Sequence, residues 1–388
     1  MEYLRRAWAE IHLDRIADNF RSYRNALGDD TEIMCVVKAD CYGHCDRAIA
    51  PYLQNKLGVR WFAVSNLEEA QRLRDIGIVG EILILGYTPP EAAKRLCSLN
   101  IIQTITEAEY ADDLCKHIAD NKKVRVHIAI DTGMTRIGLH SESINEIKSE
   151  VKKILNYEKL TVEGMFTHLS VADSDSDDDK AYTSMQIDKI LELDKSLRAD
   201  GIALNKVHFF NSAGGIYHNN SKSSFARLGI ILYGLMPNAA LALPCKLSPV
   251  MELKARIAQV KNIDAGEYIS YGRTFKAEKP MRIATVTIGY ADGFSRLLSN
   301  IGELLIGGKR TKIVGRVCMD QLMCDVTEID AKANDVVTLI GTDGDETITA
   351  DDLAGLYGTI GYEIVCGISK RVPRVVIENG NEISVFQD

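Results

Sequence analysis

Hydrophobic residues in the first part of the chain occur in short continuous runs, separated by longer amphipathic stretches. The runs are rich in valine, isoleucine and phenylalanine, and they are apolar at successive rather than alternate positions. A strand covered on both faces, as in a parallel sheet, has this pattern. Eight such runs predict strands at residues 31–37, 61–66, 81–86, 101–106, 124–131, 160–169, 206–211 and 225–234.

The stretches between these runs carry helix signals. DRIADNFRSYRNAL repeats apolar residues at helical spacing, and its first residue, Asp14, suits an N-cap. NLEEAQRLRDIG ends at a glycine, and TEAEYADDLCKHIADN is acidic at its start and basic toward its end, which matches the helix dipole. We expect further helices over SINEIKSEVKKILN and from Asp179 to Arg198, and a solvated loop over the acidic stretch 173–179.

Eight strands alternating with helices predict an α/β fold, a closed (β/α)8 barrel of the TIM type. An open doubly wound sheet is the main alternative, although no glycine-rich dinucleotide fingerprint follows the first strand. After Pro244 the chain becomes β-rich, with glycine and acidic turns, and ADDLAGLYG gives the one clear helix signal. We therefore expect two domains, the barrel at residues 1–244 and a mostly-β domain at 245–388.

Composition narrows the classes of partner. A chain of 388 residues exceeds one ordinary core, which agrees with two domains. The net charge of −8 argues against a nucleic-acid surface or an anionic membrane as partner. No apolar run reaches the roughly 18 residues that a membrane span requires, and nothing resembles a secretory signal. We expect neither nucleic acid nor membrane to bind this chain.

The nine cysteines are an odd number and lie mostly in apolar segments, which suits a reducing compartment and predicts a cytoplasmic protein. A metal site is the alternative for Cys35, Cys41, His44 and Cys45. Their spacing matches none of the usual zinc patterns, so we expect structural cysteines and no metal.

Polar residues gather where the predicted strands end, at the face on which barrel enzymes build active sites. They are Lys38, Arg136, His168, Asn211, Ser212, Arg227 and Gly229. The glycine-bearing turns after strands seven and eight suit a phosphate, because their backbone N–H groups are free. Lys38 ends the apolar run VVK, where a desolvated amine suits a Schiff base; a strand-end lysine that reaches solvent is the alternative.

These residues lie within a longer series of motifs. VVKADCYGH, HIAIDTGMTRIG, FTHLSVAD, NSAGG, RLGIILYG, ISYGRTF, TIGYADGFSR, GRVCMDQLMCDV and GYEIVCGISKRVPR follow one another along the chain. The series resembles the alanine racemase family over nearly the whole sequence. The resemblance implies a fold-type III enzyme that binds pyridoxal 5'-phosphate (PLP), forms a head-to-tail homodimer with shared active sites, and supplies D-alanine for peptidoglycan.

The resemblance also implies residue roles. Lys38 forms the Schiff base with PLP and serves the D-amino acid, while Tyr271 works from the other subunit on the opposite face and serves the L-amino acid. A racemase needs two such groups because the proton leaves one face of Cα and returns to the other. Arg136 and the backbone at Met319 hold the substrate carboxylate. The implied cofactor contacts are Lys38, Tyr42, Leu85, His168, Asn211, Ser212, Arg227, Gly229, Ile230 and Tyr362.

Arg227 is the implied partner of the pyridine nitrogen, with His208 behind it and His168 beside Tyr271. A guanidinium only donates, so the ring nitrogen accepts, stays unprotonated and draws electrons more weakly than with an acidic partner. Each role has a plainer alternative. Tyr271 is then a packed aromatic, His168 and His208 are core histidines, and Arg136 pairs with a neighbouring acid.

One position departs from the family pattern. Many members carry a lysine two residues before the DTGM aspartate, where its carbamylated form supports the substrate-binding arginine, whereas this chain has Ala129. Alanine cannot be carbamylated. We therefore expect chloride, another carboxylate or water beside Arg136.

Substrate identity has alternatives of its own. A serine or broad-specificity racemase shares this fold, because an apolar pocket rejects an added hydroxyl only weakly; Tyr362 favours alanine, since a smaller polar residue there would leave room for a hydroxyl. A PLP decarboxylase and a non-enzymatic PLP carrier are further alternatives. ISYGRTF and the compact second domain argue against the first, and the presence of a second domain argues against the other.

Overall fold

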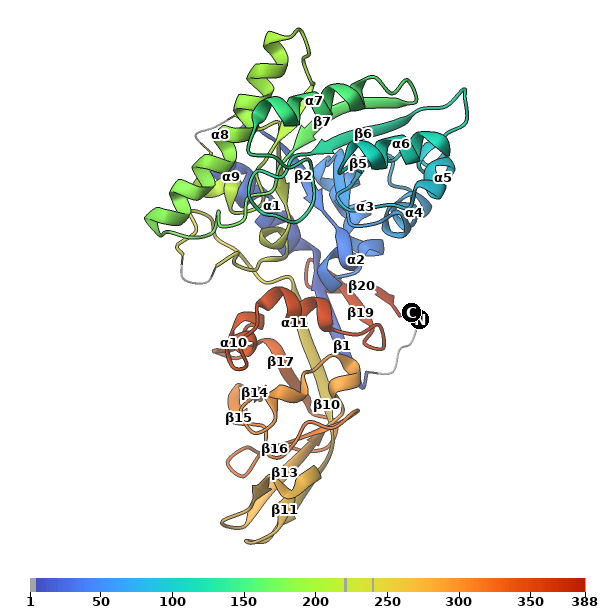
Figure 1. The fold of residues 1–388 in the computed structure, drawn as a ribbon. Coiled ribbons are helices and arrows are strands. Elements are labelled where there is room, and N and C mark those ends of the chain that lie inside the picture. Colours follow the sequence, from blue (N-terminus) through green and yellow to red (C-terminus); the bar gives the residue numbers. More distant parts are fainter. Residues whose placement is uncertain (1–4, 220–221, 239–240, 388) are drawn as a thin grey trace.

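The computed structural model describes residues 5–219, 222–238 and 241–387 and has two lobes (Figure 1). One lobe holds a parallel sheet in the order β8-β7-β6-β5-β4-β3-β2-β9. Its strands are β2 (Glu32–Val36), β3 (Trp61–Val64), β4 (Glu81–Ile84), β5 (Ile102–Ile105), β6 (Val124–Ala129), β7 (Leu160–Phe166), β8 (Lys206–His208) and β9 (Phe225–Leu228). All eight lie within the predicted ranges.

The two ends of this sheet meet. Phe210, just after β8, forms a parallel bridge with Ala226 in β9, and the N–H of Arg227 donates to the Phe210 carbonyl at 3.0 Å. The predicted barrel is confirmed, and the open doubly wound sheet is excluded.

Helices surround the barrel. They are α1 (Leu13–Leu27), α2 (Lys38–Gly43), α3 (Asp46–Leu57), α4 (Leu67–Asp75), α5 (Ala93–Ser98), α6 (Ala108–Lys116), α7 (Ile144–Leu155), α8 (Asp177–Ala199) and α9 (Gly214–Tyr217), with short 3-10 turns η1 (Pro90–Ala92) and η2 (Ile230–Tyr233). Of these, α1, α4, α6, α7 and α8 match predicted helices. The sequence gives no prediction for α3 and α5, because α3 contains Pro51 and α5 follows the proline pair of YTPPE.

Two details of the helix starts differ from expectation. Helix α1 begins at Leu13 with His12 as its N-cap, and Asp14 instead accepts a hydrogen bond from the N–H of Asn379 at 2.6 Å. The acidic stretch is not wholly a loop. Helix α8 already begins at Asp177, because Ser176 caps it and three aspartates complement the positive end of its dipole.

The second lobe is built on a ten-stranded sheet whose main path is β15-β14-β17-β10-β1-β19-β20. Its strands are β1 (Ala7–His12), β10 (Met251–Ile263), β13 (Met281–Val286), β14 (Glu303–Ile306), β15 (Lys309–Lys312), β16 (Leu322–Asp325), β17 (Val336–Asp343), β18 (Glu346–Ile348), β19 (Arg374–Glu378) and β20 (Asn381–Phe386). The segment 7–12, assigned from the sequence to the barrel, pairs here with β10 and β19. The assignment of residues 7–12 to the barrel domain was therefore wrong, because pairing partners hundreds of residues away cannot be read from local sequence.

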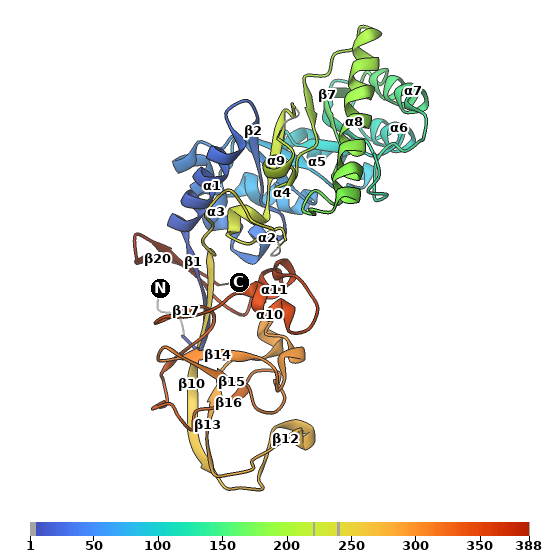
Figure 2. The same ribbon diagram turned by 90° about the vertical axis from the view of Figure 1, so that its left-hand side faces the viewer.

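Short elements complete this lobe. They are the hairpin β11 (Tyr268–Ile269) and β12 (Phe275–Lys276), the turns η3 (Tyr271–Arg273), η4 (Tyr290–Asp292) and η5 (Arg296–Leu298), and the helices α10 (Ala350–Gly355) and α11 (Gly361–Gly367). Helix α10 confirms the one predicted helix, whereas α11 was not predicted. Helix α11 lies next to the barrel, and the β11–β12 hairpin lies at the far end of the molecule (Figures 1 and 2).

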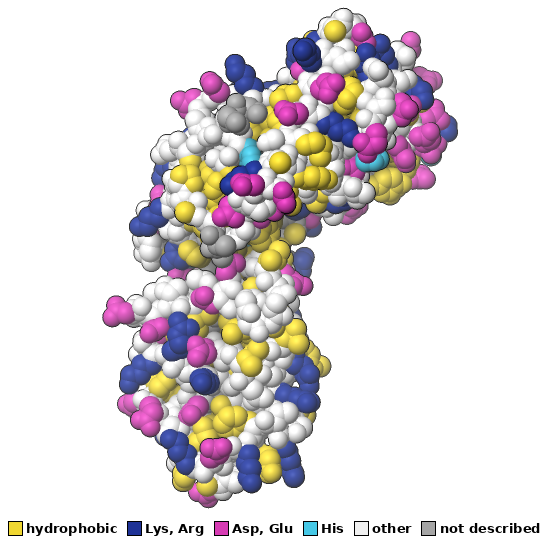
Figure 3. All heavy atoms as spheres, turned by 60° about the vertical axis from the view of Figure 1, so that its left-hand side comes forward, with side chains coloured by type: hydrophobic (Ala, Val, Ile, Leu, Met, Phe, Trp, Pro, Cys, Tyr) yellow, Lys and Arg dark blue, Asp and Glu magenta, His cyan; other side chains and the backbone are white. Residues whose placement is uncertain are grey.

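Acidic and basic side chains are interspersed over the face shown in Figure 3. Within the described ranges, none of the helices has both the length and the apolar composition that crossing a bilayer demands.

Candidate active site

Lys38 stands at the sharp turn that follows β2. The next four residues, Ala39 to Tyr42, have φ between 51° and 54°. This is the left-handed region, which residues other than glycine adopt only at a cost in backbone energy. Buried Glu69 stabilises this turn, because one carboxylate oxygen accepts from the N–H of Ala39 at 2.8 Å and the other from the N–H of Ser65 at 2.7 Å. The strained turn directs Lys38 into the barrel mouth.

The second lobe also holds this turn. The carbonyl of Gly43 accepts from Nε of buried Arg374 at 3.1 Å, and a Cβ at Gly43 would lie 2.3 Å from the carbonyl oxygen of Val365 in α11. Only glycine permits this approach, and its φ of 80° also favours glycine. The position of Lys38 therefore depends on both lobes.

A cavity of about 310 Å³ opens beside Lys38. Its lining includes Lys38, Leu85, Ala129, Arg136 and His168, from the ends of the four strands β2, β4, β6 and β7. Burial, and next the positive charge of Arg136, lower the pKa of the Lys38 ammonium. A lowered pKa favours the free amine that a Schiff base requires.

Arg136 lies on a loop that folds back on β6. The N–H of Leu139 donates to the carbonyl of Ala129 at 2.9 Å, and the carboxylate of Asp131 accepts from the N–H groups of Gly133 and Thr135. Arg136 itself forms no ion pair with any residue that the structure describes, so it does not pair with a neighbouring acid there. Asp131 also lines the cavity, but its carboxylate accepts from the backbone instead, and a guanidinium without an acidic partner suits an anionic ligand.

The residues expected around the phosphate adjoin one another at the ends of β8 and β9. The Ser212 hydroxyl accepts from the N–H of Gly229 at 2.8 Å, and a Cβ at Gly229 would lie 2.8 Å from the Tyr42 hydroxyl. The side chain of Asn211 accepts from the N–H of Gly214 and donates to the Leu169 carbonyl, which fixes the turn. Ile230 begins η2 directly after Gly229, and the ring of Tyr362 lies 6.3 Å from that of Tyr42.

Arg227 is buried and is surrounded by acceptors. Its Nη1 bonds Nδ1 of His208 at 2.9 Å, while its Nη2 donates to the carbonyl of Thr167 at 2.7 Å and approaches Nδ1 of His168 at 3.3 Å. Burial, with Arg136 next, lowers the pKa of Arg227 to about 9. Its Nε–H makes no hydrogen bond to a described residue, so one fixed donor remains for a ligand atom that accepts, such as an unprotonated ring nitrogen.

Tyr271 and Met319 are not part of this cavity within one chain. Tyr271 lies in η3 of the distant hairpin and is 70% exposed, and Met319 is 53% exposed. The two residues belong to adjoining loops, because the Ser270 hydroxyl donates to the carbonyl of Arg316 at 2.7 Å. Tyr271 is not a packed core aromatic, and the second lobe presents both residues outward as one surface.

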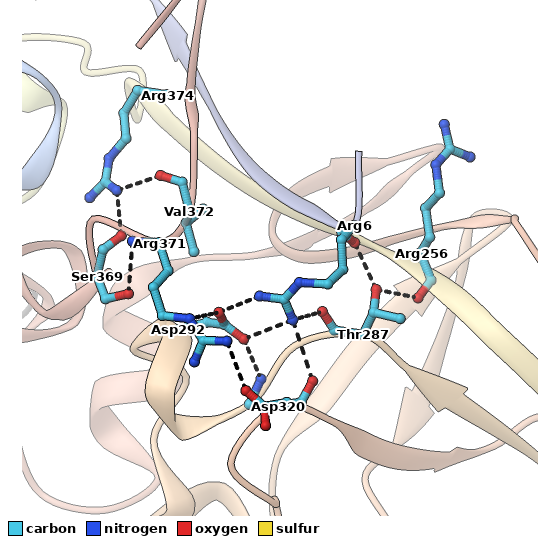
Figure 4. Close-up of polar contacts among 10 residues, drawn as sticks. Arg6, Arg256, Thr287, Asp292, Asp320, Ser369, Arg371, Val372 and Arg374 are labelled. Atoms are coloured by element: carbon cyan, nitrogen blue, oxygen red, sulfur yellow. Dashed lines mark hydrogen bonds and ion pairs between the residues drawn. The ribbon is translucent and has the colours of Figure 1, made fainter. Parts of the chain in front are cut away.

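An ionic cluster holds the Met319 loop in place (Figure 4). Buried Asp292 accepts from the Arg6 guanidinium at 2.5 and 3.2 Å and from the N–H of Gly289 at 3.0 Å, and Arg371 pairs with Asp320 at 2.8 Å. The turn so formed donates the N–H of Ala291 to the carbonyl of Met319 at 3.0 Å. The N–H of Met319 has no partner within the described part of the chain, so it is available to a ligand.

Sequence reasoning missed the residues that support the site from behind. Glu69, Arg374, Arg6 and Asp292 are buried or partly buried charges whose partners lie far away in sequence. Glu69 did carry a local signal, because it follows the N-cap Asn66 by three residues, as in a capping sequence.

One group of side chains has metal-ligand character outside the cavity. Glu10, His12 and Glu252 place one ligand atom each within 4.8 Å of the others. Arg15 and Lys254 already pair with these carboxylates at 2.7 Å, which explains the cluster as an ionic contact of the sheet. Of the four residues considered as an alternative zinc site, His44 is buried and its Nδ1 bonds the carbonyls of Cys41 and Tyr42.

Comparison with known proteins agrees with this geometry. Family models described as alanine racemase, N-terminal domain, and alanine racemase, C-terminal domain, match residues 11–237 and 250–376. An alanine racemase of Clostridium perfringens is 43% identical over 387 residues, covering 98% of each chain. The structure of alanine racemase from Bacillus anthracis with bound L-Ala-P matches with a TM-score of 0.93 at 35% identity, covering 100% of this chain and 99% of that one.

A relative named for a different activity has the same fold. The histidine racemase of Leuconostoc mesenteroides matches with a TM-score of 0.87 at 28% identity, covering 97% of this chain and 99% of that one. Both domain models, in their expected order, together with full-length identity above 40%, settle the relationship: this chain belongs to the alanine racemase family.

Proposed function

We propose that this chain interconverts L- and D-alanine with PLP bound at Lys38, and that Tyr271 of a second copy completes the site. One observation carries the proposal. A lysine with a lowered pKa shares a cavity with an arginine that has no acidic partner among the described residues, while the second proton-transfer group lies on the outer surface of the other lobe.

The residues present fit PLP. Arg227 keeps an Nε–H for the ring nitrogen, and Ser212, Gly229 and Tyr42 form a corner that a side chain at position 229 would fill. PLP, when bound, supplies an aldehyde for the Lys38 amine and an electron sink for the carbanion at Cα. Neutral His168, whose pKa is lowered well below its ordinary value by burial and then by Arg227, adds no charge beside the ring.

The chain's own groups then handle the substrate. Arg136 and the N–H of Met319 bind the carboxylate, which fixes the Cα–H bond relative to the two bases. The Lys38 amine exchanges the proton of the D-enantiomer, and the Tyr271 hydroxyl of the second copy exchanges that of the L-enantiomer. Two groups on opposite faces invert the centre without either moving around the ring.

Alanine is the substrate we propose. The relatives above 40% identity bear that name, whereas the histidine racemase is only 28% identical. Tyr362, whose ring lies 6.3 Å from that of Tyr42, also supports alanine, because a smaller polar residue there would leave room for a serine hydroxyl. Supply of D-alanine for peptidoglycan and a location in the cytoplasm remain predictions from the resemblance.

We further propose that an anion supports Arg136 where Ala129 replaces the carbamylated lysine. Ala129 lines the same cavity as Arg136, and its methyl group brings no charge. We expect the KM for alanine to fall when chloride replaces a large anion such as gluconate at constant ionic strength. Equal KM values in the two salts, and no anomalous density beside Arg136, would rule chloride out.

The direct test measures D-alanine and D-serine formation by the purified protein with PLP. We expect D-alanine from L-alanine, much less D-serine from L-serine, and visible absorbance from cofactor linked to Lys38. Lys38→Ala should abolish both the linked absorbance and racemisation. Faster turnover of serine, or carbon dioxide release from lysine or another long amino acid, would contradict the proposal.

A further inference from the structure

Three buried side chains form a line that leads from the candidate ring-nitrogen partner into the barrel. Nη1 of Arg227 bonds Nδ1 of His208 at 2.9 Å, and Nε2 of His208 bonds Nδ1 of His127 at 3.0 Å. Both histidines are fully buried. Sequence reasoning had reached only the first link, from Arg227 to His208.

The arginine sets the direction of every proton in this line. A guanidinium donates and cannot accept, so Nδ1 of His208 is the acceptor and its proton lies on Nε2. That N–H donates to Nδ1 of His127, which leaves the His127 proton on Nε2. There the line ends, since Nε2 of His127 finds no partner in the described part of the chain.

Both rings are uncharged. Burial, and next Arg125, lower the pKa of His127 to about 3, and burial followed by Arg227 lowers that of His208 well below its ordinary value. Two neutral rings can each accept on one nitrogen, whereas a protonated His208 would point an N–H at the Arg227 guanidinium.

Packing fixes the ring planes. The ring of Phe166 stacks on His208 with centroids 5.0 Å apart, and Phe225 meets it edge-on at 5.4 Å. On the other side, a Cβ at Gly164 would lie 3.2 Å from Cε1 of His127. His127, Phe166 and His208 come from the adjacent strands β6, β7 and β8, so the line is built into the barrel wall.

We propose that His127 is a positioning residue for Arg227: it holds His208 in the tautomer that accepts from Arg227, and so keeps the Nε–H of Arg227 directed at the ring nitrogen. The inference rests on the proposed binding of PLP. If the histidines only filled the core, loss of His127 would change stability without changing the cofactor.

The first measurement uses the wild-type holoenzyme labelled with ¹⁵N-histidine. NMR should show His127 and His208 neutral between pH 6 and 8 (about the working range), both with the proton on Nε2, and Gln substitution at 127 assigns that signal. A proton on Nδ1 of His208, or a charged His208, would overturn the inference. This result does not depend on turnover, so it remains separable from a failure of the proposed racemase activity.

The second measurement compares two variants. His127→Gln keeps an oxygen that can accept from His208, whereas His127→Leu keeps bulk and loses the acceptor. We expect His127→Leu to lower the rate of racemisation about tenfold, because loss of a supporting hydrogen bond has effects of this size. It should also raise the share of transamination and shift the ¹⁵N signal of the PLP ring. In His127→Gln, the rate, the partition and the ring signal should lie close to those of the wild type. The control Thr183→Val removes a buried hydroxyl of α8 that has no hydrogen-bond partner among the described residues, and it should alter none of these.

A Leu variant that binds PLP with the wild-type ring signal and reaction partition would contradict a positioning role. If that variant does not fold, the NMR measurement on the unaltered protein and the Gln variant still decide between the two interpretations.

Discussion

At the scale of single residues, the site depends on which groups are kept neutral and which keep a spare donor. Lys38 loses its proton more readily because of burial and Arg136, and Arg227 retains a charge among neutral acceptors. The sequence indicated Lys38 and Arg136 because each follows a predicted strand, and Arg227 because it lies in the eighth. It could not indicate Glu69 or His127, because their importance comes from contacts across the barrel.

Replacement of Arg227 tests the donor-only role. In Arg227→Glu, a protonated acid can give the ring nitrogen a proton and strengthen the electron sink, so we expect more transamination relative to racemisation. The loss of donors to the Thr167 carbonyl should also lower stability. Product analysis measures the ratio of transamination to racemisation, and the visible spectrum reports the state of the cofactor. An unchanged partition together with an unchanged spectrum would refute it.

Acid should destabilise the fold through the neutral histidines. The pKa of His127 is about 3 in the folded chain and about 6.5 when unfolded. Between these values the unfolded chain binds the extra proton, so this contribution to stability is complete above pH 6.5 and is lost as pH falls toward 3. Urea unfolding measures this effect: between pH 7 and pH 5, the free energy of unfolding should fall less in His127→Gln than in the wild type. Equal losses would mean that His127 is not buried and neutral.

At the scale of elements, the barrel strands were predictable because burial on both faces leaves a continuous apolar run. Strand β1 was assigned to the wrong domain, since its partners β10 and β19 are distant in sequence. Helix α3 was missed because Pro51 lies inside it. The left-handed turn after Lys38 has no local signature either: four residues other than glycine adopt it because Glu69 and the second lobe hold them there.

The strained turn gives a prediction at this scale. Glu69→Gln keeps one acceptor oxygen and points an amide NH₂ at a backbone N–H, so we expect a loss of about 1–3 kcal/mol in stability and weaker PLP binding. Glu68→Gln changes the neighbouring residue, whose exposed carboxylate pairs with exposed Arg95 at 3.5 Å, and should behave as wild type. Titration with PLP measures the cofactor affinity, and urea unfolding measures the free energy of unfolding. Unaltered PLP affinity in Glu69→Gln would show that the turn holds Lys38 without this carboxylate.

At the scale of the whole molecule, the two lobes carry different residues of the proposed site. The barrel holds Lys38, Arg136 and Arg227, whereas Tyr271 and Met319 face outward from the second lobe. Figures 1 and 2 place the β11–β12 hairpin far from the barrel of its own chain. A site containing both Lys38 and Tyr271 therefore requires a second copy, an arrangement that the sequence suggested only through its resemblance to the family.

Mixing two inactive variants tests this arrangement most directly. Lys38→Ala and Tyr271→Phe should each racemise alanine very slowly on their own. If a site takes its lysine from one copy and its tyrosine from the other, a mixed dimer contains one site with both natural residues, and activity should return as subunits exchange. If each site draws both residues from one chain, every site in the mixed dimer lacks one of them, and the mixture should stay inactive.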